Sequence, residues 1–171
     1  MNHIEDVDVD TLSGRLGQLL IDQGWTVGCA ESCTGGLLAA AFTEVAGSSQ
    51  YFDRGFVTYS NLAKVEQLGV SPETLERFGA VSEETAMEMA AGVLTAASSV
   101  HLALSTTGIA GPGGATPGKP VGMVCFGFAQ RAGNGVTTRA VTKILEGDRA
   151  AVRRASVRFS LQTAISLLLP R

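Results

Sequence analysis

Apolar residues near the start of the chain recur at the spacing of an α-helix. The stripe consists of Val9, Leu12, Leu16, Leu19 and Leu20. Such a stripe lies on one face of a helix. Gly24 follows it, and glycine is common just after the last helical turn. The pattern predicts an amphipathic helix that ends at Gly24.

Short apolar runs and helical segments alternate along the rest of the chain. The runs predict strands over 25–30, 56–59, 101–105, 123–130 and 136–144. The segments between them predict helices over 37–45, 61–68, 72–78, 83–97 and 149–169, with candidate N-caps at Asn61, Ser71, Ser82 and Asp148. The last two strands flank Gly133-Asn134-Gly135, which is typical of a hairpin. This order predicts a layered α/β fold whose central mixed sheet is parallel in part.

The composition adds that the chain is one folded domain, residues 1–171. It is 45% hydrophobic and 17% charged, which excludes a disordered protein. The formal net charge of −3 provides no broad basic field, so no nucleic-acid partner is expected. A hydrophobic share of 45% on a chain of 171 residues leaves more apolar surface than one core can bury. This predicts a homo-oligomer.

The location is predicted to be cytoplasmic. No apolar run approaches the roughly 18 residues of a membrane span, so no membrane partner is expected. Residues 1–10 carry four acidic side chains and no basic segment followed by an apolar one, so we predict no secretory signal. Three cysteines cannot all pair, which favours a reducing compartment.

Histidine chemistry is restricted because the chain has only His3 and His101. A Ser-His-Asp triad or a multi-histidine metal site is therefore not expected, and we predict no metal and no cofactor. His101 opens a strand and is predicted to be a structural residue. His3 lies at a terminus, where chains commonly fray.

The segment 31–36, Glu-Ser-Cys-Thr-Gly-Gly, is predicted to turn from a strand into a helix. Backbone amides at such a turn can hold an anion or an oxyanion. Ser32, Cys33 or Thr34 could each be a nucleophile, and without a histidine the base for a hydroxyl nucleophile would be a lysine in a desolvated pocket. The alternative is that these hydroxyls only cap the helix.

Residues 113–120 nearly match a phosphate-binding P-loop. Pro120 stands where that loop needs serine or threonine, and the chain continues into a strand instead of a helix. We therefore reject a Walker-type ATPase. The glycine-rich loop 108–120 could still surround a ligand with its amides, or serve only as a turn.

Four arginines, Arg149, Arg153, Arg154 and Arg158, crowd the start of the last predicted helix. Cations are unfavourable at a helix N-terminus and beside like charges four residues away. A bound phosphate would offset this repulsion. Neutralisation by Glu146 and Asp148 on a solvated face is the alternative.

Several motifs, taken together and in order, resemble the CinA C-terminal domain family. They are residues 30–36, 47–49, 58–61 with Lys64, 79–84, 107–114, 119–122 and 147–149 with Arg153, and they lie within residues 19–154. The resemblance implies a three-layer α/β/α sandwich. It also implies an amidohydrolase that converts nicotinamide mononucleotide to nicotinate mononucleotide and ammonia, so the expected partner is a small nucleotide substrate.

The same resemblance implies roles for individual residues. Ser32 would be the nucleophile, Lys64 its general base, and Tyr59 a neighbour that orients them or donates a hydrogen bond. We assign substrate binding to Glu31, Thr34, Gly35, Gly36, Thr107, Gly108, Ala110, Gly111, Arg149 and Arg153. The alternative function is a non-catalytic nucleotide-sensing or protein-interaction module linked to competence or the DNA damage response.

Overall fold

The computed structural model describes residues 7–170. Its helices there are α1 (Val9–Gln23), α2 (Leu37–Thr43), α3 (Asn61–Leu68), α4 (Pro72–Phe78), α5 (Glu83–Ala96) and α6 (Arg149–Leu168), with a short 3₁₀ turn at Ser48–Gln50. Its strands are β1 (Val27–Glu31), β2 (Phe52–Val57), β3 (Leu102–Gly108), β4 (Met123–Ala132) and β5 (Gly135–Ile144).

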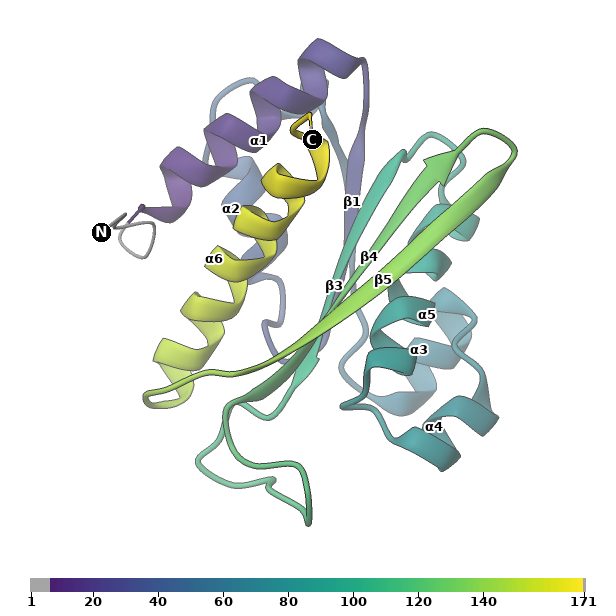
Figure 1. Cartoon of the computed structure of the whole chain (residues 1–171), viewed down its shortest axis with the longest axis vertical. Helices are drawn as coiled ribbons and strands as arrows, with labels where there is room; N and C mark the ends of the chain where they lie inside the picture. Colours follow the sequence, from purple (N-terminus) through teal and green to yellow (C-terminus); the bar gives the residue numbers. More distant parts are fainter. Residues whose placement is uncertain (1–6, 171) are drawn as a thin grey trace.

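The strands form one five-stranded sheet in the order β2-β1-β3-β4-β5. Helices α1, α2 and α6 cover one face, and α3, α4 and α5 cover the other (Figure 1). One apolar cluster, which includes Leu16, Phe42 and Leu161, fills the first interface, and a second, which includes Met89 and Val93, fills the other. The predicted three-layer α/β/α sandwich is confirmed.

Strand β1 lies between two parallel neighbours, β2 and β3. The connection from β1 to β2 passes through α2 on one face, and the connection from β2 to β3 passes through α3–α5 on the other. The connections that leave the neighbouring strands β1 and β2 therefore run on opposite faces of the sheet. In α/β sheets, ligands bind at the carboxyl ends of strands beside such a point.

The hairpin and the terminal helix follow the sequence prediction closely. Strands β4 and β5 pair antiparallel from Met123–Ile144 to Ala132–Gly135. Asp148 caps α6, since its carboxylate accepts a hydrogen bond from the Ala151 amide.

Two predicted boundaries around β2 are wrong. The strand covers Phe52–Val57 instead of 56–59, because it is an exposed edge strand that carries Asp53 and Arg54 and so lacks a continuous apolar run. The N-cap of α3 is Ser60, whose hydroxyl accepts from the Ala63 amide at 3.0 Å, while Asn61 is the first helical residue. A third boundary is also wrong, since the neighbouring strand β1 begins at Val27, two residues later than predicted.

Candidate active site

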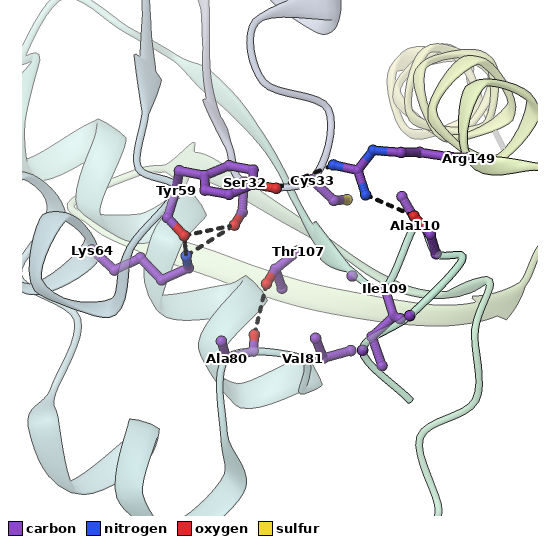
Figure 2. Close-up of a pocket in the computed structure, with 14 residues that line it drawn as sticks. Ser32, Cys33, Tyr59, Lys64, Ala80, Val81, Thr107, Ile109, Ala110 and Arg149 are labelled. Carbon is purple, nitrogen blue, oxygen red and sulfur yellow. Dashed lines mark hydrogen bonds between the residues drawn. The ribbon is translucent and has the colours of Figure 1, made fainter. Parts of the chain in front are cut away.

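The three parallel strands end at one cavity. Ser32 follows β1, Tyr59 follows β2 by two residues, and Thr107 and Gly108 end β3. The cavity has a volume of about 280 Å³. It is lined by Ser32, Cys33, Tyr59, Lys64, Ala80, Val81, Thr107, Gly108, Ile109, Ala110, Gly111, Gly113, Gly114 and Arg149 (Figure 2).

Ser32 is held at the start of the turn between β1 and α2. Its amide donates to the Thr106 carbonyl at 2.9 Å, which continues the pairing of β1 with β3. The turn then reverses through Gly35 and Gly36, whose φ angles of 56° and 105° are left-handed and favour glycine. Ser32 keeps 9% of its surface exposed, at the cavity.

Lys64 reaches Ser32 from the opposite face of the sheet. It lies on the first turns of α3, and its side chain is 1% exposed. Its Nζ is 3.0 Å from Ser32 Oγ and 3.3 Å from the Tyr59 carbonyl oxygen (Figure 2). The same Nζ is 2.7 Å from the Thr58 carbonyl oxygen. Thus the segment that follows β2 supplies two acceptors for the lysine, and the residue that follows β1 supplies the hydroxyl.

These three partners suit a neutral lysine. Burial lowers the pKa of Lys64 from 10.5 to about 8. In the neutral amine, two N–H groups can donate to the two carbonyls, and the lone pair remains for the Ser32 hydroxyl to donate to. Among residues 7–170, no carboxylate lines the cavity to hold the lysine in its charged form. The pair can therefore act as nucleophile and base.

The other two candidate nucleophiles lack such a base. Burial raises the pKa of the Cys33 thiol to about 12, so the thiolate is scarce at neutral pH. The Thr34 side chain is fully buried, and its hydroxyl is engaged by Glu31 Oε1 at 2.6 Å and Thr106 Oγ1 at 2.7 Å. Geometry thus favours Ser32 over Cys33 and Thr34.

Arg149 crosses the rim of the cavity. Its Nη1 donates to the Gly111 carbonyl at 2.8 Å, and its Nη2 donates to Tyr59 Oη at 3.2 Å (Figure 2). Arg149 also lines a second pocket at the N-terminus of α6, together with Arg153 and Ala150. Ala110 and Arg149 belong to both pockets, so the two adjoin.

The structure brings together only some of the predicted substrate-binding residues. Thr107, Gly108, Ala110, Gly111 and Arg149 line the cavity, and Arg153 lines the adjoining pocket. Four others, Glu31, Thr34, Gly35 and Gly36, line neither pocket. Those four build the turn that carries Ser32 instead of contacting the cavity.

Two cavity residues received no role from the sequence. Ala80 and Val81 lie between α4 and α5, and the Ala80 carbonyl accepts from Thr107 Oγ1 at 2.7 Å. They fall within the motif 79–84 that resembles the family, which was the available signal. Their aliphatic side chains carry no reactive group, so the two residues contribute to the cavity through its wall and through backbone atoms.

The remaining candidates have structural roles. His101 Nδ1 accepts from the Thr26 amide at 3.1 Å and its ring stacks on Trp25, so its predicted structural role is confirmed. His3 lies outside the described residues. Lys119 of the rejected P-loop donates to the Phe78 carbonyl. Arg154 is exposed and lies in a groove between α1, α2 and α6, apart from the cavity.

Within residues 7–170, no three His, Cys, Asp or Glu side chains group closely enough to hold a metal ion, and metal independence stays a prediction. Over the same residues, no helix combines the length and the apolarity that a membrane span requires.

Comparison with known proteins agrees with the resemblance. A family model described as the CinA C-terminal domain matches residues 9–168. The chain belongs to the CinA C-terminal domain family. One similar protein is the nicotinamide-nucleotide amidohydrolase PncC of Enterobacter agglomerans. It is 56% identical to this chain over 154 residues, which are 90% of this chain and 92% of that protein. The protein of the same name from Escherichia coli K12 is 51% identical over 92% of this chain and 93% of its own.

A solved structure has the same fold. The competence or damage-inducible protein from Enterobacter asburiae superposes with a TM-score of 0.90 at 37% sequence identity. The match covers 96% of this chain and 100% of that one. The described fold therefore matches that solved chain along its whole length.

Proposed function

We propose that this chain is a nicotinamide-nucleotide amidohydrolase, which hydrolyses nicotinamide mononucleotide to nicotinate mononucleotide and ammonia. The observation that carries the proposal is the buried Lys64 Nζ, 3.0 Å from Ser32 Oγ in an open cavity. Relatives that are 56% and 51% identical over 90% and 92% of this chain bear the name of this activity. A serine paired with a neutral lysine is a known arrangement for acyl transfer.

The first half of the proposed reaction transfers an acyl group to Ser32. Neutral Lys64 takes the hydroxyl proton as Ser32 Oγ attacks the carboxamide carbon. The Cys33 and Thr34 amides follow the nucleophile in the strand-to-helix turn, and we assign the stabilisation of the oxyanion to them. The tetrahedral intermediate collapses as Lys64 returns the proton to the leaving nitrogen, which departs as ammonia.

The second half regenerates the enzyme. Water attacks the acyl carbon while Lys64 accepts its proton, and the bond from that carbon to Ser32 Oγ breaks. Ser32 regains the proton from Lys64, and nicotinate mononucleotide leaves. The two carbonyls that hold Lys64 keep its nitrogen beside Ser32 through both halves.

Ammonia release from purified protein incubated with nicotinamide mononucleotide tests this proposal directly. We expect stoichiometric ammonia and nicotinate mononucleotide, with unchanged rates after EDTA treatment, because the proposed steps use only protein groups. Activity that EDTA abolishes and zinc restores would contradict the Ser32–Lys64 mechanism. Binding of the nucleotide without ammonia release would favour the sensing module.

Arg149 is proposed to contact the 5′-phosphate of the substrate. Its guanidinium keeps N–H groups beyond the two that contact Gly111 and Tyr59, and it faces the pocket beside the cavity. Arg149→Ala should raise KM for the mononucleotide about 10-fold or more, since a charge-assisted bond contributes about 1.5–3 kcal/mol. KM for nicotinamide riboside, which has no phosphate, should change much less.

The matched control is Arg154→Ala, which removes an exposed arginine from the same helix. It should leave both KM values unchanged. If Arg149→Ala raises KM equally for the mononucleotide and the riboside, Arg149 supports the cavity wall and does not bind phosphate.

The expected homo-oligomer and cytoplasmic location stay predictions.

A further inference from the structure

The turn that carries Ser32, residues 32–36, is held from two sides by charged residues that do not line the cavity. We infer that Arg153 and Glu31 are positioning residues, which fix this turn so that Ser32 and the following amides are in place before substrate arrives. The inference rests on the proposed function for its catalytic consequence. Its structural basis is a set of hydrogen bonds to the turn.

Arg153 binds two backbone carbonyls of the turn. Its Nε donates to the Cys33 carbonyl and its Nη2 to the Thr34 carbonyl, each at 3.2 Å. The guanidinium packs beside Gly35, where a Cβ would be in ordinary van der Waals contact with Arg153 Nη2 at 3.5 Å. Two successive carbonyls are thus directed toward one guanidinium on α6.

Glu31 binds hydrogen-bond donors of the turn and of the start of α2. Its side chain is fully buried, and Oε1 accepts from Thr34 Oγ1 at 2.6 Å and from the Leu38 amide at 2.7 Å. Oε2 accepts from the Ala39 amide at 3.0 Å. Gly36 is the N-cap of α2 and has no side chain to satisfy these amides, so the carboxylate of Glu31 takes that role.

The hydrogen bonds from Arg153 and Glu31 matter because the turn contains flexible residues. Gly35 and Gly36 can adopt many backbone conformations, so local preference alone would not fix the turn. In a planar trans peptide, the N–H points away from the C=O. Arg153 therefore fixes the Thr34 N–H direction by holding the Cys33 carbonyl, and Glu31 fixes the first turn of α2 behind it.

This assignment gives Arg153 a different role from Arg149, although both were predicted to bind substrate. Arg153 is absent from the lining of the cavity that holds Ser32, and its Nε and Nη2 are already committed to the turn. Loss of Arg153 should therefore reduce the rate of the chemical step. Loss of a phosphate ligand would instead weaken binding.

The test measures kcat and KM of Arg153→Ala, Arg153→Lys and Glu31→Gln with the mononucleotide and the riboside. We expect kcat of Arg153→Ala to fall about 10²-fold on both substrates, the cost of small misplacements of reacting groups. KM should change less than about 3-fold, because ground-state contacts are kept. Arg153→Lys should recover part of the kcat lost in Arg153→Ala. Glu31→Gln should lower kcat, since a carboxamide has one acceptor oxygen and an NH₂ donor where the carboxylate has two acceptor oxygens.

The matched controls are Arg154→Ala on α6 and Glu44→Gln at the C-terminal end of α2, both exposed, and both should keep wild-type kcat. A second readout is the rate at which phenylmethanesulfonyl fluoride modifies Ser32, where Oγ displaces fluoride. That rate should fall in Arg153→Ala and Glu31→Gln. Should Arg153→Ala fail to fold, Arg153→Lys and Glu31→Gln carry the test.

Two results would overturn the inference. One is a raised KM for the mononucleotide alone with kcat unchanged in Arg153→Ala, which would make Arg153 a phosphate ligand. The other is wild-type kcat and sulfonylation rate in the Arg153 and Glu31 variants. If the wild-type protein releases no ammonia, the proposed function fails, while the sulfonylation rates still decide whether the two residues position Ser32.

Discussion

Ser32→Ala is expected to remove nearly all turnover while the fold remains intact. The substitution deletes the only candidate nucleophile whose oxygen lies beside a buried amine. Removing the nucleophile of a covalent mechanism costs about 10⁴-fold or more in kcat. The measurement is ammonia release at saturating mononucleotide, with circular dichroism and thermal unfolding to verify the fold.

Cys33→Ala is the matched control, because it alters the adjacent side chain in the same cavity. Most of the activity should remain, and iodoacetamide should inactivate the wild-type enzyme slowly, since burial raises the pKa of the Cys33 thiol to about 12. An inactive Cys33→Ala protein together with an active Ser32→Ala protein would reverse the assignment of the nucleophile.

Lys64→Arg is expected to be inactive although it keeps the positive charge. Arginine stays protonated at all accessible pH values, so it cannot accept the Ser32 proton. In the wild-type enzyme, kcat/KM should rise with pH and level off above about 8, the pKa to which burial lowers Lys64. The direction follows because Lys64 is protonated and inactive below that pKa, and neutral and active above it.

The control for this substitution is Lys143→Arg, which exchanges the same residues at an exposed position on β5. Its rate and pH profile should match those of the wild-type enzyme. Substantial turnover by Lys64→Arg, or a pH-independent kcat/KM between pH 6 and about 9, would exclude Lys64 as the base.

The sequence predicted the layers and the strand-to-helix turn because periodicity and glycine positions are local signals. It left three nucleophile candidates open, since burial decides among them. Burial raises the pKa of the Cys33 thiol, and the Thr34 hydroxyl is already hydrogen-bonded to Glu31. The edge strand β2 was misplaced for a related reason, because its exposed charges carry no apolar pattern.

The role of Arg153 could not be found from the sequence. Its partners, Cys33 and Thr34, are 120 and 119 residues away and offer only backbone carbonyls, which every residue has. Glu31 was placed in the correct motif, but a carboxylate that reaches past Gly36 to cap a helix is not a local capping pattern. Both contacts depend on how α6 and α2 pack.

The buried Lys64 also affects the folding equilibrium. In the unfolded chain its amine binds a proton below its ordinary pKa of 10.5, whereas in the folded chain it binds one only below about 8. Between these values the unfolded state holds more protons, so the free energy of unfolding rises with pH through that interval. Below it the difference amounts to about 3 kcal/mol against folding, a large part of the 5–15 kcal/mol that typically stabilises a domain. Other interactions in the fold must offset this cost of burying Lys64, the amine that makes Ser32 reactive. Destabilising substitutions should therefore be tolerated least at neutral and acidic pH.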